Sequence, residues 1–202
     1  MEVVAATNNR HKLQEIRDIL KDMGYKVLSL QDVGIEVDIE ETGKTFRENA
    51  LIKAREIHKL TGKASIADDS GLEVFALNGE PGVYSARYAG VEGDGKDKVN
   101  NNKLLENMKN VPKDKRQARF VSAIAFIFPD GREIVTEGYI NGMIGYEEKG
   151  ENGFGYDPLF IVEGLDKTMA ELEPSEKNKI SHRANALKEL KKILIDMDLK
   201  YE

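Results

Sequence analysis

The chain has 202 residues, a formal net charge of −6 and no cysteine, and 40% of its residues are hydrophobic. The absence of cysteine excludes disulfide scaffolds, zinc–thiolate centres, iron–sulfur clusters and cysteine nucleophiles. No apolar run approaches the roughly 18 residues of a membrane span, and the N-terminus lacks a signal-peptide pattern, so we expect a cytoplasmic protein. The negative net charge disfavours nucleic acid as a partner. It is compatible with a metal-assisted phosphate site, because a few cations placed close to the phosphate act locally.

Apolar strands and amphipathic helices alternate along the first third of the chain. Strands are predicted over residues 3–6, 26–30 and, more weakly, 35–39, with a helix that ends at Gly24 between the first two. The capping box Thr45-Phe46-Arg47-Glu48 predicts a second helix, which ends at Gly62. A short buried strand over residues 64–67 then leads into Asp68 and Asp69.

The second part of the chain combines two glycine-rich stretches with further regular elements. Residues 96–109 predict a helix, and the segments 119–128 and 132–140 flank a Pro-Asp-Gly turn typical of a β-hairpin. A last helix is predicted from about Ala184. The sequence therefore predicts a single mixed α/β domain over residues 1–202, with two lobes around a groove.

The segment from Thr7 to Lys12 joins a buried strand to a helix start. Free backbone N–H groups and the positive end of the helix dipole favour an anion at such a junction, and Arg10 and Lys12 add positive charge. A phosphate group is therefore a candidate ligand. The alternative is a simple N-cap with solvated basic side chains.

Two pairs of acidic residues are candidates for a magnesium site. Glu40 and Glu41 precede a glycine turn, and Asp68 and Asp69 follow a buried strand. Magnesium prefers one or two carboxylates together with water and phosphate oxygens. Since consecutive residues of a strand point to opposite sides, Asp68 and Asp69 are expected to have different roles. A turn with Asx hydrogen bonds is the alternative for Asp68 to Gly71.

The remaining candidate residues are less specific. Lys53 either reaches a phosphate or is solvated, and Glu48 is explained by the capping box. The run from Phe154 to Asp157 can stack on a base and hydrogen-bond its edge, or it can form a β-bulge that packs Phe154 into the core. Donors gather between Lys177 and Arg183, immediately before the last helix.

Taken together and in order, these motifs resemble the inosine-triphosphate pyrophosphatase family, and in particular its bacterial and archaeal branch. The resemblance spans residues 7 to 183. The matching segments are Thr7-Asn8-Asn9 with Lys12, residues 41–50 with Lys53-Ala54, residues 67–72, Pro81 to Tyr88, Phe154-Gly155-Tyr156-Asp157-Pro158 and Ile180-Ser181-His182-Arg183. One departure is that the first loop carries Asn8-Asn9 and Arg10-His11 where the family often has glycine.

The resemblance implies a two-lobed mixed α/β fold with a long central mixed sheet, a nucleotide cleft between the lobes and a homodimer. It also implies Mg²⁺-dependent hydrolysis of dITP, ITP and XTP to the monophosphate and pyrophosphate. The roles it implies for individual residues are triphosphate binding by Thr7, Asn8, Asn9, Arg10, His11 and Lys12; magnesium binding by Glu40 and Asp69; proton acceptance by Asp69; phosphate neutralisation by Lys53; nucleotide contact by Ser70; and base binding by Phe154, Gly155, Tyr156, Asp157, Lys177, His182 and Arg183.

Two alternatives stay open beside this interpretation. One is a related pyrophosphatase that acts on other nucleotides, because a fold does not fix base preference. The other is a catalytically silent nucleotide- or RNA-binding module. The presence of Asp69 with Glu40 and Lys53 argues against a silent module, since binding alone needs no acid that activates water, and the acidic charge balance argues against general RNA binding.

Overall fold

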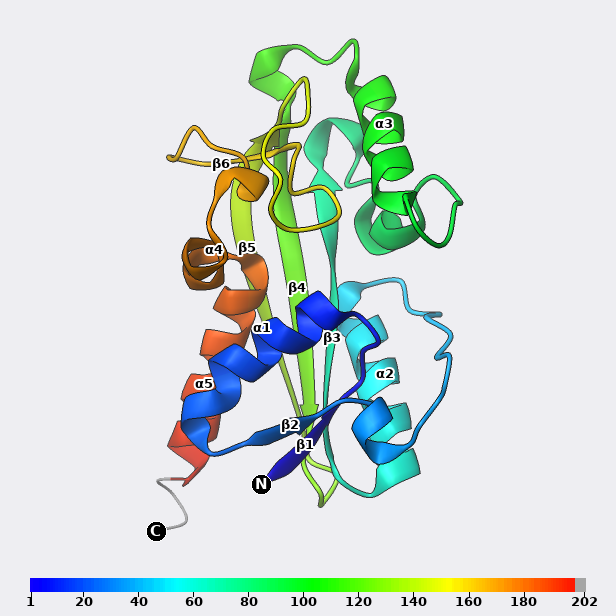
Figure 1. The fold of residues 1–202 in the computed structure, drawn as a ribbon, viewed down its shortest axis with the longest axis vertical. Coiled ribbons are helices and arrows are strands. Elements are labelled where there is room, and N and C mark those ends of the chain that lie inside the picture. The colour runs from blue at the N-terminus through cyan, green and yellow to red at the C-terminus, as the bar shows by residue number, and fades with distance from the viewer. Residues whose placement is uncertain (199–202) are drawn as a thin grey trace. The chain divides into compact units, whose positions relative to one another are not determined.

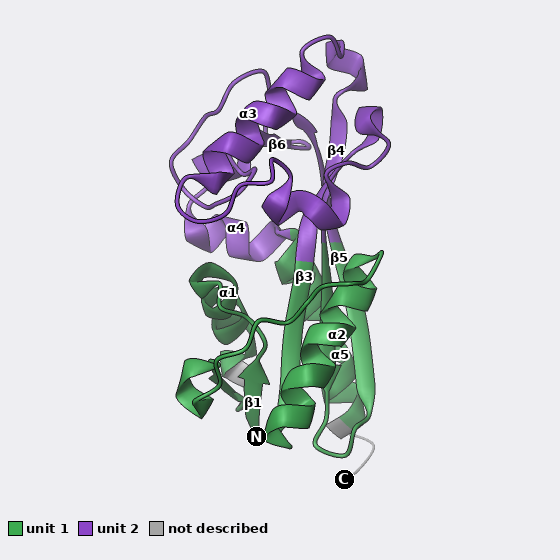
Figure 2. Ribbon diagram, turned by 90° about the vertical axis from the view of Figure 1, so that its right-hand side faces the viewer, with its two compact units in different colours: residues 1–69, 122–138, 182–202 green, residues 70–121, 139–181 purple. Residues whose placement is uncertain are grey.

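The computed structural model describes residues 1–198, and its chain divides into two compact units. Unit 1 comprises residues 1–69, 122–138 and the described residues from 182 onward, and unit 2 comprises residues 70–121 and 139–181 (Figure 2). The strands form a mixed sheet in the order β2-β1-β3-β4-β5-β6. The expected mixed α/β fold is therefore confirmed.

The elements follow one another along the chain as labelled in Figure 1. The strands are β1 (Glu2–Ala5), β2 (Lys26–Leu28), β3 (Ala64–Val74), β4 (Gln117–Ile127), β5 (Glu133–Ile144) and β6 (Phe160–Val162). The α-helices are α1 (Arg10–Leu20), α2 (Phe46–Thr61), α3 (Lys96–Met108), α4 (Pro174–Ile180) and α5 (His182–Asp198). Short 3-10 helices cover Lys21–Met23, Gln31–Val33, Phe75–Leu77, Gly82–Arg87, Lys113–Lys115 and Met169–Glu171. No helix within residues 1–198 combines the length and the apolarity needed to cross a membrane.

Unit 1 is a sheet with helices on both faces. Strand β1 pairs in parallel with β2 and with β3. Val3 and Ala5 belong to a buried cluster with residues of α1 and α5, and these two helices pack against each other. On the opposite face, the Ser65 hydroxyl donates a hydrogen bond to the Ala54 carbonyl of α2 at 2.8 Å. Alternate residues of β3 thus face different helices.

Unit 2 has its own apolar core. That core joins β3, β4 and β5 to α3 and to the loop before β6, and it includes Leu72, Leu104, Phe120, Tyr156 and Phe160. Strand β6 pairs antiparallel with β5, with Met143 opposite Ile161. Arg116 is buried here, and backbone carbonyls of four residues accept hydrogen bonds from its guanidinium: Met108, Val111, Ile144 and Gly145.

Local signals predicted most of these elements. Thr45 and Glu48 form the expected capping box of α2, and Gly62 ends that helix with a positive φ angle of 64°. Gly24, with a φ angle of 70°, ends the 3-10 helix Lys21–Met23, whereas α1 itself already ends at Leu20. The hairpin between β4 and β5 is also confirmed, since the Phe128 N–H donates to the Arg132 carbonyl at 2.9 Å.

Three predictions about local structure were wrong or incomplete. Residues 35–39 form no strand: their side chains alternate between half-buried and exposed, but no strand of the six-stranded sheet pairs with them. Asp68 to Gly71 form no turn, because β3 continues through them. The last helix begins at His182 rather than Ala184, and α4 and β6 were not predicted.

Candidate active site

The loop after β1 is shaped by hydrogen bonds that cap α1. The side-chain oxygen of Asn9 accepts from the backbone N–H groups of His11, at 2.9 Å, and Lys12, at 3.1 Å. The N–H of Asn9 in turn donates to the Thr7 hydroxyl at 3.1 Å. The predicted phosphate segment is therefore an ordered helix start. No acidic residue lies in the first turn of α1, so the positive end of the helix dipole and the basic side chains of this segment both favour an anion.

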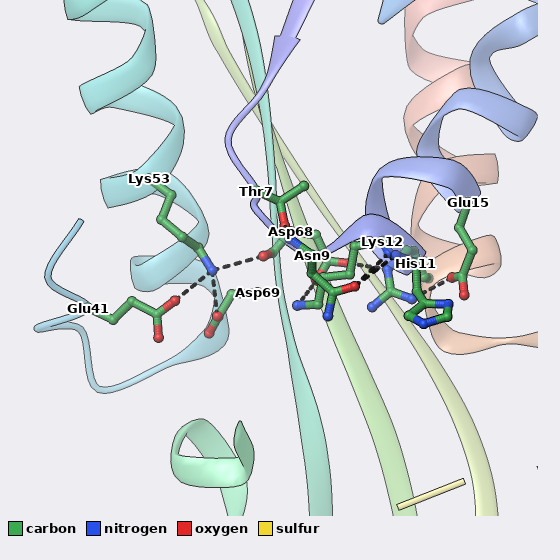
Figure 3. A network of polar contacts seen from close by, with 10 residues as sticks. Thr7, Asn9, His11, Lys12, Glu15, Glu41, Lys53, Asp68 and Asp69 are labelled. Carbon is green, nitrogen blue, oxygen red and sulfur yellow. Dashed lines mark hydrogen bonds and ion pairs between the residues drawn. The ribbon is translucent and has the colours of Figure 1, made fainter. Parts of the chain in front are cut away.

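Asp68 is the centre of an ion-pair network on the face that α1 and α5 cover (Figure 3). Its Oδ1 lies 3.2 Å from the Lys12 ammonium, and its Oδ2 accepts a hydrogen bond from Nε of Arg183. The Nη1 of Arg183 also pairs with Glu15. Burial alone would raise the pKa of the Asp68 carboxyl, but Arg183 and Lys12 hold that pKa well below its usual range.

Asp69 belongs to a second network, on the face that α2 covers (Figure 3). The Lys53 ammonium lies 2.8 Å from Asp69 Oδ1, 2.8 Å from Glu41 Oε1 and 2.9 Å from the Asp68 carbonyl oxygen. Burial raises the pKa of Asp69, although the Lys53 charge opposes that shift. Burial alone would lower the pKa of Lys53, but Asp69 and Glu41 raise it above its usual value. The two neighbouring aspartates therefore have different partners, as the alternation of a strand predicts.

The chemistry of this second network suits a hard divalent cation. Glu41 and Asp69 each accept a hydrogen bond from the same ammonium, so their oxygens face one point. Magnesium prefers such oxygens and completes its coordination with water and phosphate. Within residues 1–198 no three acidic or histidine side chains are grouped to hold a metal ion, so a bound ion would need those additional oxygens. Glu40, the predicted ligand, is exposed, whereas Glu41 meets Asp69 at Lys53.

The predicted base-binding run lies in unit 2 and consists of turns rather than a β-bulge. Asp157 Oδ2 lies 2.7 Å from the Lys177 ammonium and accepts from the Phe154 N–H at 3.0 Å. The same ammonium lies 4.7 Å from the centroid of the half-buried Phe154 ring. An aromatic face, a cation and a carboxylate thus occur together in this unit.

Neighbouring residues hold the rest of this run in place. The Tyr156 hydroxyl donates to the Ser85 carbonyl at 2.8 Å, and its buried ring belongs to the unit 2 core. The N–H of Gly155 donates to Asp97 at 2.7 Å, and its carbonyl accepts from Asn101 at 3.1 Å. Tyr156 therefore serves the packing of unit 2, while Phe154 stays at its surface.

The structure separates the predicted residues into sets. Lys12, Lys53, Asp69 and Arg183 belong to connected networks in unit 1, where His182 is buried at the first residue of α5 and Asn8, Arg10 and His11 are exposed. Ser70 is half-buried in β3 and, like the Phe154 run, belongs to unit 2. Sequence reasoning missed Glu15 and Asp97, because their partners Arg183 and Gly155 are distant in sequence and no local pattern links them.

Comparison with known proteins places the chain in a family. Residues 3–193 match the model of the Ham1 family. The chain is 51% identical to the dITP/XTP pyrophosphatase of Bacillus subtilis, with 96% of each chain covered. It is 53% identical to the protein of the same name from Haemophilus influenzae, covering 94% of this chain and 97% of that one.

Solved structures agree with this assignment. The Ham1 protein of Staphylococcus aureus has a TM-score of 0.86 and 46% identity, with 98% of this chain and 100% of that chain covered. A HAM1 protein from Coxiella burnetii has a TM-score of 0.88 and 42% identity, with 97% and 99% covered. The segments behind the resemblance lie inside the matched range, and the chain belongs to the Ham1 family.

Proposed function

We infer that this protein is a dITP/XTP pyrophosphatase, which hydrolyses dITP, ITP and XTP to the monophosphate and pyrophosphate and so clears non-standard purine nucleotides. The observation that carries this conclusion is the convergence of Glu41 and Asp69 on Lys53, in a chain 51% identical to a dITP/XTP pyrophosphatase over 96% of its length. Metal-assisted hydrolysis of a polyphosphate uses carboxylates to hold the metal ion and a lysine to neutralise phosphate charge, and this site offers both.

Unit 1 supplies the groups for the phosphates. We assign triphosphate binding to the residues from Thr7 to Lys12, and phosphate neutralisation to Lys53. Asp69 would accept the proton of the attacking water, a role that suits a carboxyl whose pKa burial raises. Asp69 and an acid of the pair Glu40 and Glu41 would hold Mg²⁺, which supplies compensation of the phosphate charge when bound.

Base recognition is assigned to Phe154, Gly155, Tyr156, Asp157 and Lys177 with His182 and Arg183, and nucleotide contact to Ser70. The nearness of the Phe154 ring to the Lys177 ammonium supports this assignment, because a ring can stack on a purine while a cation reads its oxygen. Arg183 is paired with Asp68 and Glu15, so any contact that it makes with a base must be compatible with those ion pairs.

Hypoxanthine and xanthine carry an oxygen at position 6, where adenine carries an amino group. Donors that pair with that oxygen would face the hydrogens of adenine, and each buried donor left unpaired costs about 1–3 kcal/mol. We therefore expect dITP and XTP to be hydrolysed with a higher kcat/KM than dATP. We further propose that residues 1–202 act as one functional domain, that the protein is a homodimer and that it works in the cytoplasm.

The test is a magnesium-dependent pyrophosphate-release assay with dITP, XTP, dATP and dGTP. Asp69→Asn should abolish turnover while the variant still folds, because Lys53 keeps Glu41 and the Asp68 carbonyl oxygen as partners. Asp38→Asn, a change at an exposed acid, should leave turnover intact. Turnover of the Asp69→Asn variant at the wild-type rate would refute the assigned proton acceptor. Equal kcat/KM for dITP, XTP and dATP would refute the proposed base reading.

A further inference from the structure

The Lys53 ammonium is fully engaged inside the protein. An ammonium has three N–H donors, and those of Lys53 have three acceptors at 2.8–2.9 Å: Glu41 Oε1, Asp69 Oδ1 and the Asp68 carbonyl oxygen. Only 12% of the Lys53 side chain is exposed. While these contacts persist, this ammonium has no proton left to donate to a phosphate oxygen.

The loop that carries Glu40 and Glu41 is held to the start of α2 by hydrogen bonds, so the contact of Glu41 with Lys53 is part of the fold. The Gly43 N–H donates to the Asn49 side chain at 2.8 Å, and the Lys44 N–H donates to Glu48 at 2.6 Å. A Cβ on Gly43 would lie only 2.6 Å from the Asn49 oxygen. Asn49 precedes Lys53 by one helical turn on the same face of α2. The loop therefore presents Glu41 to Lys53 at a fixed position.

Two carboxylates that face one point repel each other unless a cation lies between them. In this structure that cation is the Lys53 ammonium, which contacts both Glu41 and Asp69. A divalent cation would seek the same oxygens. Displacing the ammonium would leave it partly buried without its two carboxylate partners, and this is costly unless another anion replaces them.

We propose that the Lys53 ammonium is an internal counter-ion, which pairs with Glu41 and Asp69, the acid pair, in the metal-free protein. When metal and triphosphate bind together, the ammonium exchanges these carboxylates for a phosphate oxygen. This inference rests on the proposed function, since the triphosphate supplies the new partner of Lys53. It makes metal and substrate binding mutually dependent: a free divalent cation must compete with Lys53, whereas one that arrives with a polyphosphate gives Lys53 another anion. Such coupling is reciprocal between the two ligands.

The test measures Mn²⁺ binding in the absence of any nucleotide, by calorimetry and by the electron paramagnetic resonance signal of free Mn²⁺. Lys53→Met removes the resident cation, and we expect it to bind Mn²⁺ at least tenfold more tightly than the wild type. Lys53→Arg keeps the charge and should bind as weakly as the wild type. Lys59→Met, a change at an exposed lysine of the same helix, should also match the wild type.

Unchanged or weaker Mn²⁺ binding by Lys53→Met would overturn the proposal, because it would mean that Lys53 does not compete for the acid pair. If Lys53→Met does not fold, Lys53→Gln replaces it in the same Mn²⁺ titration, because the glutamine amide keeps polar contacts without the charge. A thermal-shift titration adds a second readout: Mn²⁺ should raise the Tm of the uncharged variants more than that of the wild type. These measurements contain no nucleotide, so failure of the proposed hydrolysis would be seen separately.

Discussion

The buried ion-pair network around Asp68 makes a quantitative prediction about stability. The side chains of Asp68 and Arg183 are 0% and 1% exposed, and Glu15 and Lys12 complete a set of two anions and two cations. Asp68→Asn preserves the shape of the side chain but leaves the set with an excess positive charge. Removing one partner of a buried pair costs about 3–5 kcal/mol. That is a large part of the roughly 5–15 kcal/mol that stabilises a typical domain.

Urea denaturation at neutral pH measures this loss. Glu2→Gln is the matched control, because Glu2 also pairs with two cations, Lys26 and Lys63, but its side chain is 41% exposed. Exposed pairs contribute little, so this control should lose far less stability than Asp68→Asn. Equal stability of the two variants would show that the burial of the Asp68 network does not govern its energy.

The pH dependence supplies an independent check. Since the pKa of Asp68 is lowered in the folded protein, its charge stabilises the fold above the unfolded pKa of 3.8, and this contribution is lost as the pH falls below that value. Asp68→Asn lacks this contribution at every pH. The difference in free energy of unfolding between wild type and variant should therefore shrink as the pH falls from 5 toward 2, and a constant difference would contradict the assigned pKa direction.

Two further predictions concern packing. Gly138→Ala should destabilise the protein by about 1–3 kcal/mol, because the new Cβ would lie 2.2 Å from backbone atoms of α5; Gly145→Ala, whose nearest neighbour would be 3.4 Å away, should be tolerated in the same urea titration. Tyr156→Phe should lower the unfolding free energy by about 1 kcal/mol through loss of its buried bond to the Ser85 carbonyl. Tyr84→Phe, at a 60% exposed site, is its control, and equal effects would refute the hydrogen-bond assignment.

The sequence predicted those elements whose signals are local. A capping box and a C-terminal glycine delimit α2, and a Pro-Asp-Gly turn marks the hairpin, because a few adjacent residues decide these structures. The extended segment 35–39 has the alternation of a strand but no ladder partner, and pairing is a property of the whole sheet. Local pattern alone could not reveal its lack of a neighbour.

The path of β3 through Asp68 and Asp69 was unpredictable for a related reason. Carboxylates are costly inside a buried strand, so the local interpretation ends the strand or makes a turn. The structure compensates both charges with cations from three helices: Lys12 of α1, Lys53 of α2 and Arg183 of α5. Those contacts join residues between 16 and 115 positions apart in sequence. Only the folded chain brings the compensating charges together.

The alternation of β3 also explains how one dipeptide serves two networks. Asp68 shares the face of Ile66 and meets cations of α1 and α5, whereas Asp69 shares the face of Ser65 and meets Lys53 of α2. Asp68 also reaches the second network through its backbone carbonyl, which accepts from Lys53. A shift of this strand by one residue would turn each carboxylate to the opposite face of the sheet and so away from its own cations. The register of β3 with β1, in which Ile66 lies opposite Ala5, therefore fixes which aspartate is placed in the acid pair and which in the buried network.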